Sequence, residues 1–323
     1  MKQVRLSQQG IVAVVLAVLF ICSAVLLDGF LTAQNMTALL QNVSVLGILG
    51  LAMALVVIGR GVDISLIASL AVPPGIVLQM VLNGHALAPA LATAIIVAVI
   101  IGLLNGVLIA FAEVPSIFAT LATGLFLAGF GQTFVFDLDV VPWSGGMAGF
   151  EVLGQGKVYG IPIPILLFAG VSLAVGLLLS GTRLGAFIYA IGDNALAARV
   201  TGIPARSVVM LQYVLAALIG CFAGLILASS VTSMPTRIFN STLIYDVILV
   251  VVLGGIGLAG GKGGVLNVIL GTLLIGTMLN VMTIMDMPYS TQNLVKGVVL
   301  LIAVIADSFI NPRNEETSQQ GDI

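Results

Sequence analysis

Residues 88–111 read APALATAIIVAVIIGLLNGVLIAF, and none of them carries a charge. A helix needs about 20 consecutive apolar residues to cross the hydrocarbon core of a bilayer. This stretch has 24 residues, and only Thr93 and Asn105 in it have polar side chains. It therefore predicts a membrane-spanning helix with one amide side chain at membrane depth.

Similar apolar runs fill the chain on both sides of this stretch, and charged residues, prolines or asparagines mark the breaks between them. The predicted runs cover residues 11–27, 43–59, 64–82, 88–111, 115–136, 162–180, 208–230, 243–259, 264–284 and 294–310. We therefore expect an all-α polytopic membrane protein with about ten transmembrane helices.

The composition excludes a soluble globular protein. Of the 323 residues, 60% are hydrophobic and 7% are charged, whereas soluble domains carry roughly 25% charged residues. A surface that is as apolar as the interior must face lipid. The net charge of -2 and the absence of a basic stripe exclude nucleic acid as a partner.

The residues that catalysis or metal binding would need are missing. There is one histidine, and the two cysteines, Cys22 and Cys221, lie far apart inside apolar runs. The glycine-rich stretch 254–263 is not a phosphate loop, because Ile256 stands where glycine is needed and Gly263 where serine or threonine is needed. No catalytic residue, metal site or cofactor is predicted.

The positions of lysine and arginine predict the orientation, because cytoplasmic loops carry the excess of positive charge. With the N-terminus inside, the cytoplasmic set is Lys2, Arg5, Arg60, Arg183, Arg199, Arg206, Lys262 and Arg313. Only Lys157, Arg237 and Lys296 fall outside or near the outer end of a span. Both termini are then cytoplasmic, segment 137–161 is external and segment 181–207 is cytoplasmic. The predicted transmembrane domain covers 1–310, and a cytoplasmic tail covers 311–323.

Glycine is abundant, with 38 residues, and small residues let helices approach closely in lipid. Gly102 with Gly106, and Gly220 with Gly224, form two GxxxG pairs. Each pair indicates either a contact between two protein chains or packing inside one chain.

A few polar residues fall at membrane depth, where they are expected to face the bundle interior or a water-filled path. Amides outnumber carboxylates there, which favours a neutral polyhydroxylated solute. We expect Asn105, Gln132 and Asn280 to line the solute path. The alternative role for each is a hydrogen bond between helices. Asp246 can instead lie in the first turn of its helix and complement the helix dipole.

Segment 181–207 is the longest cytoplasmic segment inside the chain. Asp193 or Asn194 is a suitable cap for a short helix over 195–200, and Gly202 is suited to end it. Such a surface helix favours docking to a cytoplasmic partner. We expect this segment to transmit movement of the partner to the spans on either side, and we call it the coupling segment. The residues expected to do so are Gly192, Asp193, Asn194, Ala197, Ala198, Arg199 and Gly202. Alternatively, Arg199 only anchors the segment to anionic lipid.

Two stretches resemble the permease subunits of ribose-type (monosaccharide) ABC importers. Residues 188–203, IYAIGDNALAARVTGI, are similar to the family pattern YAIGGNPEAARLSGI, and residues 252–263, VLGGIGLAGGKG, are similar to VLGGxSLxGG(R/K)G. The resemblance covers nearly the whole chain. The family pattern GGIDLSVGS appears as RGVDISLIA over 60–68, so Arg60 and Ile67 replace glycines.

The resemblance implies a permease domain of ten helices in a bacterial inner membrane, with no enzyme activity of its own. It implies a cytoplasmic ATPase subunit bound at 181–207, a periplasmic solute-binding protein and a second permease copy or a paralogue. The solute would be a sugar or a similar polyhydroxylated molecule. The alternatives are an ABC permease for branched-chain amino acids or nucleosides, and a secondary transporter driven by an ion gradient.

Overall fold

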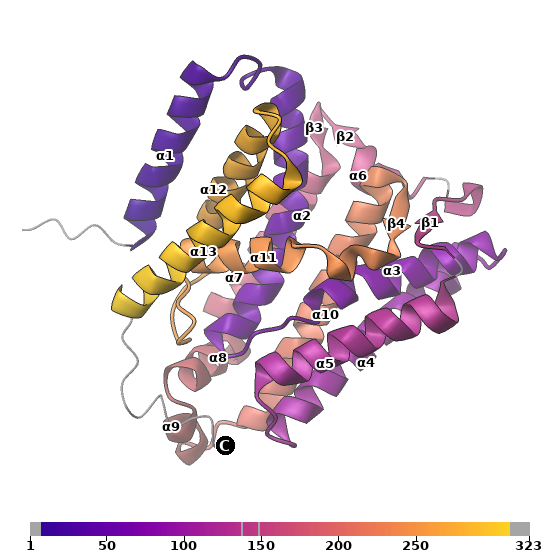
Figure 1. The fold of residues 1–323 in the computed structure, drawn as a ribbon. Helices are drawn as coiled ribbons and strands as arrows, with labels where there is room; N and C mark the ends of the chain where they lie inside the picture. Colours follow the sequence, from indigo (N-terminus) through magenta and orange to yellow (C-terminus); the bar gives the residue numbers. More distant parts are fainter. Residues whose placement is uncertain (1–7, 137, 148, 311–323) are drawn as a thin grey trace, which may run out of the picture.

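The computed structural model describes residues 8–136, 138–147 and 149–310, and most of them are helical (Figure 1). The α-helices are α1 (Gln8–Leu26), α2 (Ala33–Ile58), α3 (Leu66–Leu82), α4 (Leu87–Ala110), α5 (Ser116–Phe130), α6 (Val152–Gln155), α7 (Ile163–Gly181), α8 (Arg183–Asp193), α9 (Ala195–Val200), α10 (Ala205–Val231), α11 (Leu243–Leu253), α12 (Val265–Ile284) and α13 (Tyr289–Ile310). A π-helix, η1 (Gly131–Val135), extends α5, and η2 (Gly145–Met147) and η3 (Thr236–Asn240) are 3₁₀-helices.

Each predicted apolar run coincides with a helix, namely α1 to α5, α7 and α10 to α13. Among the described residues, seven helices are long and apolar enough to cross a membrane, and α3, α11 and α13 contribute shorter apolar stretches. The predicted run 243–259 is too long, because α11 ends at Leu253 and Gly255 then adopts a φ of +92°. With 11 residues, α11 is about 16 Å long, against a hydrocarbon core of about 30 Å.

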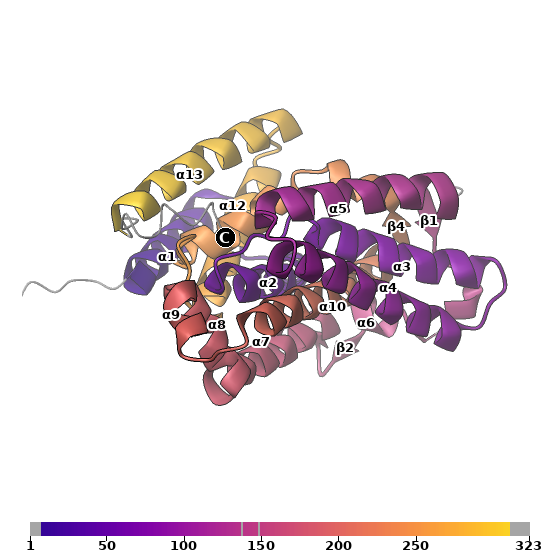
Figure 2. The ribbon, with the colours of Figure 1, turned by 90° about the horizontal axis from the view of Figure 1, so that it is seen from below.

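Helix α2 runs through the interior of the bundle (Figures 1 and 2). It contacts α7, α10, α11 and α12, and nearly every side chain from Val43 to Ile58 is buried. A helix that is apolar on all sides is expected in such a position, because it meets no aqueous surface. Thr32 caps its first turn by accepting a hydrogen bond from the Asn35 backbone N–H.

Both GxxxG pairs pack inside the chain, which decides between the two alternatives for them. Gly102 and Gly106 of α4 face the backbone of α10, where a Cβ on Gly106 would lie 2.6 Å from the Met210 Cα. Gly220 and Gly224 of α10 face α3, where a Cβ on Gly224 would meet the Leu70 carbonyl. Helix α10 is therefore held between α4 and α3 by backbone-to-backbone contact.

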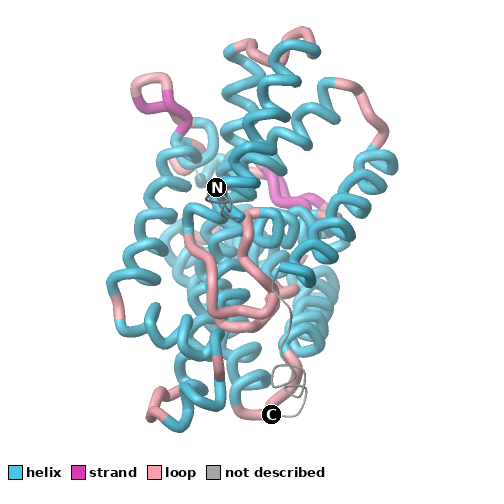
Figure 3. The backbone as a smooth tube through the Cα atoms, turned by 90° about the vertical axis from the view of Figure 1, so that its left-hand side faces the viewer, coloured by secondary structure: helices cyan, strands magenta, loops and turns pink. Residues whose placement is uncertain are grey.

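The segment after η1 contains short strands, which an all-α prediction does not include (Figure 3). β1 (Val140–Pro142) pairs with β4 (Ser233–Pro235), and β2 (Lys157–Val158) pairs with β3 (Ile161–Pro162), both antiparallel. The two residues between β2 and β3, Tyr159 and Gly160, have φ values of +50° and +83°. Positive φ at both positions is what a tight hairpin turn requires.

Some predictions concern residues outside the described ranges. The predicted cytoplasmic tail, 311–323, lies outside them, as do Lys2, Arg5 and Arg313 of the cytoplasmic set.

Candidate functional site: the coupling segment

The predicted coupling segment forms two short helices, α8 and α9, at the lower end of the bundle in Figure 1. Thr182 caps α8, where its Oγ1 accepts a hydrogen bond of 3.2 Å from the Gly185 N–H. Asn194 caps α9, where its Oδ1 accepts a hydrogen bond of 2.9 Å from the Ala197 N–H. The predicted short helix over 195–200 is confirmed, and Asn194 rather than Asp193 is its cap.

Helix α9 ends as its sequence predicts. Gly202 has a φ of +85°, which a side chain would disfavour. The Gly202 N–H donates to the Arg199 carbonyl at 3.0 Å, and the Ile203 N–H donates to the Ala198 carbonyl at 3.1 Å. This pair of bonds is the Schellman pattern that ends a helix at glycine.

The two faces of α9 differ in a way that the sequence did not reveal. Ala198 is buried against the bundle, whereas Ala197 and Arg199 are exposed. Leu196 and Val200 are 63% and 89% exposed, and residues four apart share one face of a helix. An exposed apolar pair on a short helix at one end of the bundle is a candidate contact surface. The i, i+4 spacing of Leu196 and Val200 is the sequence feature that could have indicated this exposed face.

The two signature stretches contact each other. Gly192 at the end of α8 lies against the Ile58 carbonyl and the backbone of Gly261, so a side chain at position 192 would collide with both. The Gly261 N–H donates to the Ile58 carbonyl at 2.8 Å, and the Tyr189 hydroxyl donates to the Gly263 carbonyl at 2.7 Å. The coupling segment is therefore fastened to the end of α2 and to the loop 254–264.

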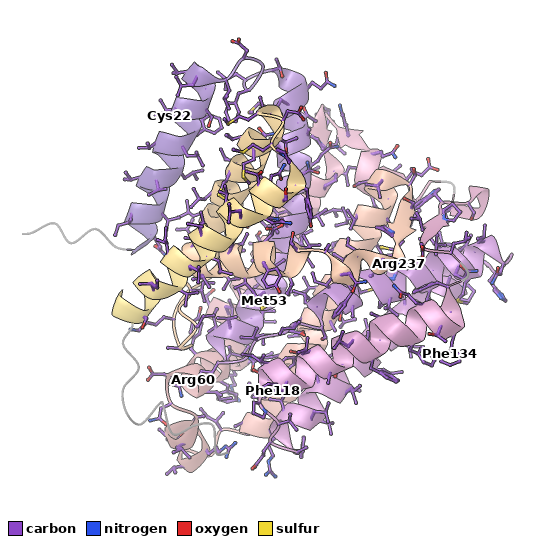
Figure 4. The ribbon with its side chains drawn as sticks, in the orientation of Figure 1. Cys22, Met53, Arg60, Phe118, Phe134 and Arg237 are labelled. Atoms are coloured by element: carbon purple, nitrogen blue, oxygen red, sulfur yellow. The ribbon has the colours of Figure 1, made fainter. Side chains whose placement is uncertain are left out.

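Arg60 joins the same three segments, and Figure 4 shows it near α8 and α9. Its Nε donates to the Ala259 carbonyl at 2.8 Å, and its Nη2 donates to the Asp193 carbonyl at 3.2 Å. Its φ of +71° is unusual for a residue with a side chain. Asp193 thus takes part through its backbone oxygen, while its side chain is exposed.

The three amides expected on a solute path lie on three elements, and no bond connects them in the described chain. Asn105 is fully buried on α4, where its Nδ2 donates to the Ser65 Oγ at 2.7 Å. Asn280 on α12 is half-buried and exchanges two hydrogen bonds with Asn35 of α2, at 2.8 and 3.0 Å. Gln132 on η1 is exposed.

A buried ion pair between α11 and α13 is a polar feature that the sequence did not predict. The Lys296 Nζ lies 2.9 Å from Asp246 Oδ1, and both side chains are almost completely buried. Lys296 also donates to the Thr242 Oγ1 at 3.0 Å. Asp246 does lie in the first turn of α11, as predicted. Its pairing with Lys296 was not predicted. A buried carboxylate needs such a partner, because removing an unpaired charge from water is costly.

No group of three or more potential metal ligands occurs among the described residues. The features that remain as a candidate functional site are the exposed face of α9 and the bonds that fasten α8, Arg60 and the loop 254–264 together.

Comparisons with known proteins agree with the two signatures. Residues 35–304 match the family described as "Branched-chain amino acid transport system / permease component". The chain is 36% identical over 293 residues to the ribose import permease protein RbsC of Bacillus subtilis (strain 168), covering 90% of each chain. It is 35% identical over 312 residues to the L-arabinose transport system permease protein AraH of Escherichia coli (strain K12), covering 94% of this chain and 92% of that one. No solved structure matches.

The matched region includes eight of the ten apolar runs that the sequence predicts, part of a ninth and both signature stretches. The chain therefore belongs to this family of transport-system permease components.

Proposed function

We propose that this chain is the permease subunit of an ATP-driven importer for a sugar or a similar small polyhydroxylated solute in a bacterial inner membrane. The observation that carries the proposal is the similarity, along nine-tenths of the chain, to permeases named for ribose and for L-arabinose. The family description names branched-chain amino acids, but the similar relatives name sugars, so a sugar is favoured.

The test is solute uptake into vesicles that contain the permease, its ATPase subunit and its binding protein. Labelled pentoses or hexoses are expected to enter only with ATP and the binding protein, while labelled leucine and nucleosides do not. ATP-driven uptake of leucine without any sugar uptake would contradict the substrate class. Uptake by the permease alone, driven by an ion gradient, would show a secondary transporter instead.

The proposed topology has ten crossings, with both termini in the cytoplasm. Two observations support it: each predicted apolar run coincides with a helix, and α8 and α9 lie at one end of the bundle while the β2–β3 hairpin lies at the other (Figure 1). The lysine and arginine bias then places α8 and α9 on the cytoplasmic side. The shorter helices α3 and α11 would cross together with the loops that flank them.

The proposed docking surface for the ATPase subunit is the exposed face of α9, formed by Leu196, Val200, Ala197 and Arg199. Its apolar pair favours a protein partner over lipid anchoring, because anchoring to head groups needs charge rather than exposed Leu and Val side chains. A displacement of α9 by the ATPase subunit would be transmitted to the end of α2 through the contacts of Gly192 and Arg60. The binding protein would meet the opposite end, and a second permease copy or a paralogue would complete the path.

The solute path is proposed to include Gln132, which is exposed, together with Asn105 and Asn280. The latter two would reach a solute only in a state that breaks their bonds to Ser65 and Asn35.

Leucine replacements separate a path role from a packing role. Gln132→Leu is expected to lower uptake while leaving thermal unfolding unchanged. Asn105→Leu is expected to lower stability as well, by about 1–3 kcal/mol, because a buried Ser65 hydroxyl loses its donor. Uptake assays and unfolding curves of the purified variants decide this, and normal uptake by all three variants would assign these amides to packing.

A further inference from the structure

A cavity of about 440 Å³ lies at the end of the bundle where α8 and α9 sit. The end of α2, the turn between α4 and α5, α9 and the first turns of α10 form its walls. Its volume falls in the usual range for sites that hold a small molecule, roughly 300–1,000 Å³. The uptake of a solute, as proposed above, does not account for this cavity beside the docking helix.

Three arginines from three separate elements line this cavity: Arg60 after α2, Arg199 on α9 and Arg206 on α10. The only carboxylate among the lining residues is Glu113, which lies 3.4 Å from Arg206 in a partly exposed pair. Such a pair contributes little, so Arg206 remains able to bind another anion. The cavity therefore carries a net positive charge in a chain where 7% of residues are charged.

The inner part of the cavity adds neutral hydrogen-bonding groups. Tyr213 is 2% exposed, and its hydroxyl interacts with the side chain of Ser116. Tyr213 stands seven residues after Arg206, so two helical turns of α10 place both on the same face. Ser116, at the start of α5, also lines the cavity. The two hydroxyl groups therefore add neutral hydrogen-bonding groups to the lining of the cavity.

We propose that this cavity binds the phosphate group of a small organic phosphate from the cytoplasm and that the bound molecule restrains the coupling segment. Arginine pairs well with phosphate because its planar guanidinium donates two parallel hydrogen bonds. The hydroxyl groups of a sugar phosphate would meet Tyr213 and Ser116.

The restraint follows from where the arginines stand. Arg199 moves with α9, whereas Arg206 belongs to the long helix α10 of the bundle. A ligand bound to both would link α9 to α10, so it would oppose the displacement of α9 by an ATPase. The regulatory part of the inference rests on the proposed function, while the binding part does not.

Binding is measured by calorimetry on the full-length permease in detergent, without phosphate buffer or anionic lipid. The probes are inorganic phosphate, a pentose 5-phosphate and the unphosphorylated pentose. Both phosphates are expected to bind, and the neutral pentose is not. Arg206→Gln should raise the Kd about tenfold, because it removes a charge-assisted hydrogen bond. Tyr213→Phe should raise it about threefold, and Lys157→Gln, which removes an exposed positive charge outside the cavity, is the control.

A lipid head group is the other source of the same chemistry, so short-chain phosphatidylglycerol is titrated in parallel. If the lipid alone binds, and Arg206→Gln and Tyr213→Phe both weaken it, the phosphate site stands and its occupant is lipid. If no phosphate compound binds, or if binding survives both variants, the site is refuted. Neither result depends on which solute the permease carries.

The regulatory part is tested in vesicles that contain all subunits. A pentose 5-phosphate on the ATPase side should reduce uptake by the wild-type protein and by Lys157→Gln, and Tyr213→Phe should require about three times more of it. Binding without any reduction of uptake would overturn the restraint.

Discussion

At the scale of single residues, Arg60 shows how a departure from a family pattern is accommodated. The family pattern GGIDLSVGS has glycine where this chain has Arg60. The backbone at Arg60 keeps a conformation that suits glycine, with a φ of +71°. A non-glycine residue in this region is disfavoured by roughly 1 kcal/mol or more. The two hydrogen bonds from its guanidinium to Ala259 and Asp193 offset that penalty.

Replacing Arg60 separates its two effects. Arg60→Gly removes the bonds and the backbone penalty together, so the free energy of unfolding is expected to change little. Arg60→Ala removes the bonds but keeps the penalty, so it should be less stable than Arg60→Gly by about 1 kcal/mol. Both variants should transport less solute per ATP hydrolysed, because α8 is no longer tied to the end of α2.

Unfolding of the purified variants and the ratio of uptake to ATP hydrolysis in vesicles check this prediction. Equal stability of the two variants would exclude backbone strain at this position. An unchanged transport ratio in both would mean that Arg60 does not transmit movement.

At the scale of elements, α9 combines a buried side and an exposed apolar side within six residues. Ala198 fits against the bundle because its side chain is small. Leu196 and Val200 face away from it and are exposed. Gly202 and Asn194 set the two ends of the helix, so they position this surface without forming it.

Polar substitutions on the exposed side of α9 should weaken the ATPase contact. Burying a Leu or Val side chain is worth roughly 1.5–3 kcal/mol, so Leu196→Ser and Val200→Ser should each weaken binding about tenfold or more. Val158→Ser is the matched control, because Val158 is 42% exposed on the β2–β3 hairpin at the other end.

Co-purification of the ATPase subunit and ATP-driven uptake are the measurements. Normal binding by both α9 variants would place the docking surface elsewhere. Arg199→Lys tests lipid anchoring separately: a loss of ATPase binding with the charge preserved would show that the shape of the guanidinium matters.

At the scale of the whole molecule, the orientation rests on the distribution of charge and can be tested by cysteine labelling. In a Cys22→Ser, Cys221→Ala background, Tyr159→Cys is expected to react with a membrane-impermeant maleimide in intact cells, because Tyr159 is fully exposed at the external hairpin. Leu196→Cys should react only after the membrane is opened, because α9 is expected in the cytoplasm. The reverse pattern would invert the topology.

The apolar runs, the small helix α9 and both of its ends followed from the sequence alone. Hydrophobic length, an Asn cap and a Gly stop are local properties, and local rules decide them. The two signature stretches indicated a family that the similarity to the ribose and arabinose permeases confirms. The end of α11 was missed, although its start at Leu243 was predicted, because Gly255 stops a helix whose apolar pattern continues.

Only the tertiary structure decided which residues meet. It paired Asn105 with Ser65, Asn280 with Asn35 and Lys296 with Asp246. It also brought Gly192 to Ile58 and Gly261, and it turned Ala198 inward and Val200 outward. These contacts join residues far apart in the chain, and they depend on how closely glycine-lined helices approach, which the spacing of residues in one sequence does not specify.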